Sequence, residues 1–266
     1  MPRLPVHYIP HGGGPCFFME WTMGPRDVWD RMAAHLSGLA QTVGVAPRAV
    51  IVISAHWEES EFTVTAQKQP PLLYDYYGFP PHTYAIQYPA PGSPELAADI
   101  GDLLAEAGIP SRSDTSRGLD HGVFIPFKLI YPEAQIPIVQ LSLKEGLDAE
   151  AHIEAGSAIA PLRDEGVLIV GSGMSYHNMQ AYMSGQPPSA SESFDRWLTE
   201  TVEAEPSERN DRLRHWESAP MARGAHPREE HLIPLMVAAG AAGRDAGKRV
   251  YADNLMGAAV SGYRFG

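Results

Sequence analysis

The sequence lacks several features by which common classes of protein are recognised. It has a single cysteine, Cys16, which excludes intrachain disulfides and cysteine-rich metal sites and leads us to expect a protein of the reducing cytoplasm. No apolar stretch approaches the roughly 18 residues that a membrane-spanning helix needs. Only 20 basic residues stand against 32 acidic ones, so the formal charge is −12. This balance argues against binding to nucleic acid or to a membrane surface.

Four common catalytic motifs are also missing. The chain contains no Gly-x-x-x-x-Gly-Lys-[Ser/Thr] phosphate loop, no Gly-x-Ser-x-Gly nucleophile turn and no His-Glu-x-x-His zinc motif. The run that begins at Gly171 starts like a dinucleotide-binding turn but lacks the third glycine. His226 and His231 are five residues apart and cannot share one face of a helix. A metal site would therefore have to be assembled from segments that are distant in sequence.

The pattern along the chain is an alternation of short apolar runs and amphipathic stretches. Of the 266 residues, 44% are hydrophobic and 20% charged, which is typical of a folded globular protein. Strands are predicted at residues 6–9, 49–54, 62–65, 138–143, 167–170, 249–252 and 260–264. Helices are predicted at residues 27–43, 94–107, 123–131, 149–162, 191–202, 208–216 and after position 231. This order predicts an α/β fold, in which one three-layer domain spans residues 1–266 and helices flank a mostly parallel or mixed sheet.

Two prolines and one long loop add detail to this prediction. Pro126 and Pro234 are each expected in the first turn of a helix, because proline breaks a helix when it lies further inside. The irregular stretch at residues 69–93 is rich in proline, tyrosine and glycine. Loops of this length inside compact domains are typically lids or binding loops.

Five of the 11 histidines lie at the ends of predicted elements. His11, His56 and His177 follow three of the strands, whereas His121 and His231 precede helices. Because ligands of open α/β sheets bind outside the carboxyl ends of the strands, these side chains can converge on one point. Each alone is more simply explained as a structural residue, but five together indicate a shared site. Neutral imidazoles suit Fe, Zn, Cu or Ni, and surplus histidines suit acid–base work near neutral pH.

Seven short motifs follow one another along the chain. They are Pro10-His11-Gly12, Ser54-Ala55-His56-Trp57, Tyr88-Pro-Ala-Pro-Gly-Ser93, Gly118-Leu-Asp-His121-Gly122, Pro137-Ile-Val-Gln-Leu-Ser142, Gly171-Ser-Gly-Met-Ser-Tyr-His177-Asn178 and Glu230-His231-Leu-Ile-Pro-Leu235. In sequence and in order they resemble the motifs of class III extradiol ring-cleavage dioxygenases. The similarity is closest to the DOPA-dioxygenase type and more distant to the catalytic subunit of protocatechuate 4,5-dioxygenase, and it covers the chain from position 6 to about position 240.

The resemblance implies a metal centre and an acid–base residue. It assigns His11, His56 and His231 to the metal. His177 matches the acid–base histidine and can also approach the metal as a fourth ligand. The protocatechuate type has glutamate as its third ligand, so Glu230 is a rival to His231. The implied working ion is Fe(II), but three neutral histidines also accept Zn²⁺, so zinc can occupy the site in purified protein.

The resemblance further implies a small aromatic substrate. This would be a catechol-type (ortho-dihydroxy) ring that is cleaved outside the diol with O₂. His121 matches a residue beside the substrate ring, and Trp57 and Tyr76 are predicted to form part of the wall around it. The sequence is compatible with a homodimer.

Two other functions are compatible with the same histidines. A zinc hydrolase would use them to activate water, with Glu230 or Asp120 as the base. A non-enzymatic binding protein of the same superfamily would keep the residues without turnover. Oxygen consumption separates the dioxygenase from the hydrolase, because hydrolysis uses no O₂.

Overall fold

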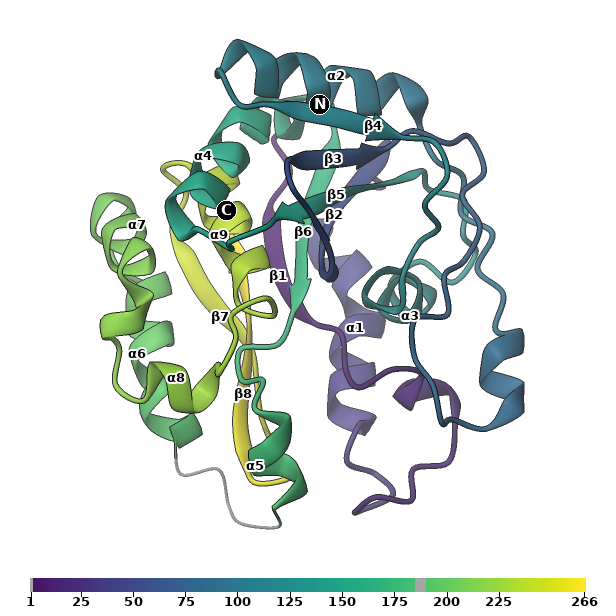
Figure 1. The fold of residues 1–266 in the computed structure, drawn as a ribbon, viewed down its shortest axis with the longest axis vertical. Coiled ribbons are helices and arrows are strands. Elements are labelled where there is room, and N and C mark those ends of the chain that lie inside the picture. The colour runs from purple at the N-terminus through teal and green to yellow at the C-terminus, as the bar shows by residue number, and fades with distance from the viewer. Residues whose placement is uncertain (1, 185–189) are drawn as a thin grey trace.

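A computed structural model describes residues 2–184 and 190–266 and has a mixed sheet at its centre (Figure 1). In this part of the chain eight strands pair in the order β4-β3-β5-β2-β6-β1-β8-β7. Neighbours within β5-β2-β6-β1 are parallel, as are β3 and β4, whereas the β3–β5, β1–β8 and β7–β8 pairs are antiparallel. The predicted α/β fold with a mixed sheet is confirmed. The strands are β1 (Val6–Pro10), β2 (Ala49–Glu59), β3 (Phe62–Thr65), β4 (Ser111–Asp114), β5 (Ile138–Lys144), β6 (Val167–Gly173), β7 (Gly247–Leu255) and β8 (Ala258–Phe265).

Helices cover both faces of the sheet (Figure 1). α1 and α3 pack together on one face, α4 and α9 pack together on the other, and α2 lies over β3 and β4. The α-helices of the described residues are α1 (Asp30–Val43), α2 (Pro94–Glu106), α3 (His121–Ile130), α4 (Ala149–Ile159), α5 (Met179–Met183), α6 (Ala190–Val202), α7 (Pro206–Arg214), α8 (Ala222–Ala225) and α9 (Ile233–Ala242). Short 3₁₀ helices lie at Cys16–Phe18, Pro81–Ala85, Ala160–Glu165 and Trp216–Ser218.

α9 is the central helix of its layer, and every one of its residues is buried. Two glycines allow it to approach α4 closely. A Cβ atom added at Gly240 would lie 2.0 Å from the carbonyl oxygen of Ile153, and one added at Gly156 would lie 2.1 Å from that of Val237. Although α9 is apolar, the described part of the chain contains no helix with the length and apolar character needed to cross a bilayer.

Several boundaries differ from the sequence prediction. α1 begins at Asp30 rather than at position 27, because residues 25–30 form turns in which Val28 and Asp30 donate to the carbonyl groups of Pro25 and Asp27. β4 was not predicted, since its sequence Ser-Arg-Ser-Asp is polar and the strand exists by pairing with β3. The short helices α5 and α8 were not predicted either, because one turn leaves no apolar periodicity.

The position of Pro126 is a further correction. The helix predicted from position 123 begins at His121, so Pro126 lies inside α3 rather than in its first turn. A proline has no N–H to donate to the carbonyl group four residues earlier, which here belongs to Gly122. The Ser172 hydroxyl donates to that carbonyl instead. A side chain of the neighbouring strand therefore replaces the hydrogen bond that proline removes. Pro234, in contrast, lies in the first turn of α9 as predicted.

A buried histidine in β1 gives the fold a testable dependence on pH. His7 is fully buried, and neither of its ring nitrogens has a hydrogen-bond partner among the described residues. Burial, with Arg264 and His35 nearby, lowers its pKa to about 3. Between pH 6.5 and 3 the unfolded chain binds a proton here that the folded chain does not, so stability falls as the pH falls through this window. The expected cost from pH 7 to pH 5 is about 2 kcal/mol.

We expect the stability of the His7→Leu variant to fall less between pH 7 and pH 5 than that of the wild type. Leucine forfeits no hydrogen bond at this position and cannot take up a proton. Urea unfolding at pH 7 and pH 5 measures the difference, and the exposed histidine variant His215→Leu serves as the control. Equal pH dependence in wild type and His7→Leu would contradict the assignment.

Candidate metal centre

The five histidines singled out in the sequence lie together at the carboxyl ends of β1, β2 and β6. His11 directly follows β1 and donates its backbone N–H to Gly173. His177 lies beyond the end of β6. His231 precedes α9, and its carbonyl group accepts hydrogen bonds from the Tyr8 hydroxyl (2.7 Å) and the Met174 N–H (3.1 Å). The carboxyl ends of the strands and the start of α9 therefore position the backbone of these three histidines.

His56 reaches the same point by a route that the sequence did not predict. The strand expected to end at position 54 continues to Glu59, so His56 lies within β2 rather than after it. The pairing of β2 with β5 shifts register between Ile53 and Glu58. His56 lies within this irregularity, and its ring contacts that of His11.

Three of the histidines have the spacing of ligands to one ion. The ring centroids of His11 and His56 are 4.9 Å apart, those of His11 and His231 are 5.2 Å apart, and those of His56 and His231 are 4.9 Å apart. One nitrogen from each ring lies within 4.8 Å of the other two. Since metal–imidazole bonds are about 2.0–2.1 Å long, a single cation between the rings is geometrically reasonable.

The same three side chains are neutral, and two of them have buried ring nitrogens without a hydrogen-bond partner in the part of the chain that the structure describes. Both ring nitrogens of His11 and Nε2 of His56 are buried without a hydrogen-bond partner among the described residues. Burial, reinforced by the neighbouring histidines, holds the pKa of His11, His56 and His231 well below the usual value. Buried polar atoms normally have a partner. A divalent cation would satisfy one nitrogen of each ring, so the donor set fits a metal of the Fe or Zn kind.

Glu230 links the metal cluster to His177. Its Oε1 lies 2.8 Å from Nδ1 of His231 and 3.2 Å from Nδ1 of His177, whose rings stack at a centroid distance of 3.4 Å. Burial raises the pKa of Glu230, but hydrogen bonding from His177 and the charge of Arg228 outweigh it and lower the pKa overall. An ionised carboxylate only accepts hydrogen bonds, so Nδ1 of each ring carries the proton. Nε2 of both rings is thereby left with its lone pair.

His121 is held by an aspartate that the sequence analysis missed. Oδ1 of Asp75 accepts from the backbone N–H of His121 and lies 2.9 Å from its Nδ1. The ring of His121 packs 4.0 Å from that of His56, and the ring of Tyr76 contacts His121 edge-on at 5.9 Å. The loop at residues 69–93 thus supplies both Asp75 and Tyr76. Nothing in the spacing of positions 75 and 121 could have related the two residues.

Asp120 is held by hydrogen bonds from neighbouring side chains. It is fully buried and accepts from Ser54 (2.7 Å), from Gln140 and from Arg117 (3.3 Å). Arg117 also donates to the carbonyl group of His56 (3.1 Å). Burial, followed by the nearby charge of Asp75, raises the pKa of Asp120. With its oxygens occupied in this way, Asp120 braces the irregular part of β2.

The two predicted wall residues differ in placement. Tyr76 contacts His121, as described above, and donates its hydroxyl to the carbonyl group of Thr83 (2.7 Å). Trp57 is buried, donates its indole N–H to Glu59 (2.8 Å) and lies under the guanidinium group of Arg117 at 4.8 Å. No ring contact joins Trp57 to the five histidines within the described residues. The structure therefore brings Tyr76, but not Trp57, against the cluster.

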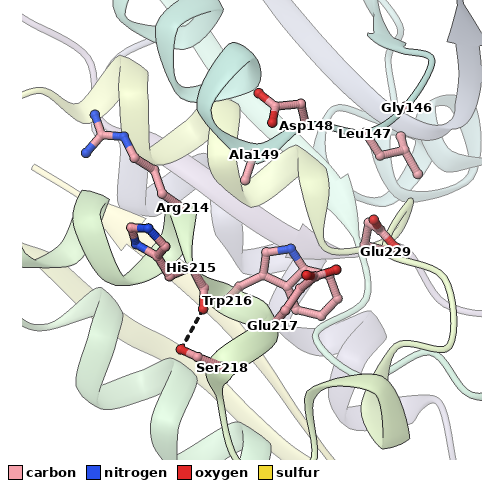
Figure 2. Close-up of a pocket in the computed structure, with 10 residues that line it drawn as sticks. All are labelled: Gly146, Leu147, Asp148, Ala149, Arg214, His215, Trp216, Glu217, Ser218 and Glu229. Atoms are coloured by element: carbon pink, nitrogen blue, oxygen red, sulfur yellow. Dashed lines mark hydrogen bonds between the residues drawn. The ribbon is translucent and has the colours of Figure 1, made fainter.

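A separate hollow of about 410 Å³ lies near the start of α4 (Figure 2). It is lined by residues 146–149 and 214–218 together with Glu229, and none of the five clustered histidines lines it. Glu229 pairs with Arg223, whereas the next residue, Glu230, contacts His177 and His231. The two adjacent glutamates thus have different partners, and of the two only Glu230 belongs to the histidine cluster.

Comparison with known proteins identifies the family of this chain. Residues 5–266 match the family described as the catalytic LigB subunit of aromatic ring-opening dioxygenase. A 4,5-DOPA dioxygenase extradiol from Beta vulgaris is 45% identical over 75% of this chain and 75% of its own length. A 4,5-DOPA dioxygenase extradiol from Escherichia coli is 33% identical over 90% of this chain and 85% of its own.

Two more relatives extend over nearly the whole chain. The dioxygenase tasH of Hapsidospora irregularis is 36% identical over 100% of this chain and 86% of its own length. A crystal structure of an uncharacterized protein from Escherichia coli K12 superposes with a TM-score of 0.77 at 29% identity and covers 99% of this chain and 100% of that one. The chain therefore belongs to the LigB family of aromatic ring-opening dioxygenases and is a ring-cleaving enzyme of the extradiol type.

Proposed function

We propose that this chain is an Fe(II)-dependent dioxygenase that opens the ring of a catechol-type substrate outside the diol. His11, His56 and His231 would hold the metal, and His177 and His121 would act on the substrate. The observation that carries the proposal is the set of buried, neutral and unpartnered imidazole nitrogens in the cluster. The names of the relatives, which describe extradiol cleavage of DOPA, support a catechol as the substrate class.

A metal bound by His11, His56 and His231 would supply the template and the electron path between a diol and O₂. Because these three ligands are neutral, the site would favour a catecholate anion. The anion requires a base, and Nε2 of His177 is suited to accept the hydroxyl proton because Glu230 accepts from Nδ1 of the same ring. Glu230 also stabilises the positive charge that His177 then carries.

His121 is suited to stabilise charge on the opposite side of the cluster. Asp75 accepts from its backbone N–H and from Nδ1, so the ring is held with Nε2 free. Tyr76 packs edge-on against this ring and is proposed as part of the wall for the substrate. Small aromatic ligands bind in mainly apolar pockets that contain a few polar groups. Here His177 and His121 would be the polar groups, and Tyr76 would be part of the apolar wall.

The test is reconstitution of the metal-free protein with Fe(II) under nitrogen, followed by addition of catechol and air-saturated buffer. We expect O₂ consumption equal to the substrate consumed, together with the absorbance of a ring-opened semialdehyde. The Zn²⁺-loaded protein is the matched control and should consume no O₂, because zinc is not redox-active. Iron binding without O₂ uptake for any catechol would contradict the proposal.

A further inference from the structure

An apolar cavity adjoins the histidine cluster. Its volume is about 270 Å³, and its lining includes the side chain of His177 together with Gly12 and Gly13, which directly follow His11. The cavity thus begins at the proposed base and at the backbone next to a proposed metal ligand. A diol ring that His177 contacts would therefore lie next to this cavity.

The inner walls of the cavity are aromatic. Trp21 and Trp29 are buried and pack edge-to-face with their rings 5.1 Å apart, and Tyr176 and Tyr182 pack in the same way at 5.4 Å. All four side chains line the cavity. They come from segments far apart in sequence, which shows that the cavity is formed by the fold and not by a single loop.

The remaining lining is dominated by methionine. Met174 is buried, whereas Met23, Met179 and Met183 are largely exposed at 64%, 54% and 84%. Methionine side chains are unbranched and polarizable, so they adapt to apolar ligands of varied shape. Exposed methionines around an aromatic cavity are the arrangement expected at a mouth that admits such a ligand.

Charged groups are absent from this lining. Apart from His177, no residue given as lining the cavity, within residues 2–184 and 190–266, has an acidic or basic side chain. The arginines near the cluster are also engaged. Arg228 donates through both terminal nitrogens to Glu58, and Arg117 is bound to Asp120. A substituent with a carboxylate or ammonium group would therefore lose its hydration without gaining a counterion.

We infer that the enzyme selects catechols that carry an uncharged apolar substituent, such as an alkyl or aryl chain, and that this cavity is the subsite for that substituent. The inference rests on the proposed function, since it places the diol at the histidine cluster. Apolar cavities of about 150 Å³ hold a benzene ring, so 270 Å³ accommodates a ring or a chain of several carbons. Each buried methylene group is expected to raise affinity about fourfold.

The experiment compares catechol, 4-propylcatechol and DOPA in two assays. Dissociation constants are measured by tryptophan fluorescence on the Zn²⁺-loaded protein under nitrogen, and kcat/KM is measured by O₂ uptake on the Fe(II)-loaded protein. We expect 4-propylcatechol to bind at least tenfold more tightly than catechol and to show a similar gain in kcat/KM. DOPA should gain nothing over catechol, because its side chain carries two charges.

Met179→Lys introduces a charge at the mouth of the cavity and should reduce the preference for 4-propylcatechol over catechol severalfold. Met221→Lys is the matched control, since Met221 is equally exposed at 52% but does not line the cavity. Equal affinity for DOPA and 4-propylcatechol, or a preference that survives Met179→Lys unchanged, would overturn the inference. Tight 4-propylcatechol binding without O₂ uptake would instead support the subsite and refute the dioxygenase proposal. O₂ uptake with catechol but no gain in affinity for the propyl chain would support the dioxygenase proposal and refute the subsite.

Discussion

The His177→Ala variant is expected to keep its metal and to lose ring-cleaving activity by a factor of about 10²–10⁴, the usual contribution of a positioned acid–base group. The imidazole nitrogens of His11, His56 and His231 remain in place without it, so the metal content should be unchanged. What disappears is the ring whose Nδ1 contacts Glu230 and whose other nitrogen can take a hydroxyl proton. Metal analysis together with kcat from O₂ uptake tests both halves of this expectation.

The pH profile distinguishes a lost base from a distorted site. If His177 takes the proton, activity that remains in His177→Ala should rise with pH, because catechol then ionises without help from the protein. His215→Ala is the matched control, since His215 is exposed and lines the separate hollow near α4. Its activity and pH profile should equal those of the wild type. Full ring-opening activity in metal-loaded His177→Ala would show that His177 is not the base.

The sequence was sufficient to predict the convergence of the histidines, because their positions follow from topology. A residue that follows a parallel strand must lie at the carboxyl end of the sheet, so the positions of His11 and His177 could be predicted without coordinates. His231 could be placed because Pro234 marks the first turn of the helix that follows it. The apolar strands and the proline therefore determined where these three side chains lie.

The supporting residues could not be predicted in this way. Asp75 contacts His121 across 46 positions through an irregular loop whose path follows no periodicity. The role of Asp120 depends on Ser54, Gln140 and Arg117, three side chains brought together only by packing. Similarly, the extension of β2 to Glu59 depends on pairing with β5 after a register shift, which an apolar pattern that ends at position 54 does not encode. Contacts of this kind depend on the tertiary structure alone.

Variants of two adjacent residues, Glu230 and His231, distinguish which of them binds the metal. His231→Ala should reduce metal content from one ion per chain to a small fraction, because it removes one of the three proposed imidazole ligands. The fold should persist, since the contacts of Tyr8 and Met174 are made to the His231 carbonyl group, which alanine retains. Metal analysis after dialysis measures the loss, and thermal unfolding of the metal-free proteins checks the fold.

Glu230→Gln is the variant to compare with His231→Ala. Glu230 contacts Nδ1 of His231 and Nδ1 of His177, so we expect its carboxylate to orient and polarise both rings rather than to bind the metal itself. Glutamine keeps the shape but loses the charge. Metal affinity should then weaken by about 10–100-fold, the usual effect of removing such an outer partner, while full loading at excess Fe(II) remains possible. If Glu230→Gln abolished binding and His231→Ala retained it, the glutamate and not the histidine would be the third ligand, because only a direct ligand is indispensable at saturating metal.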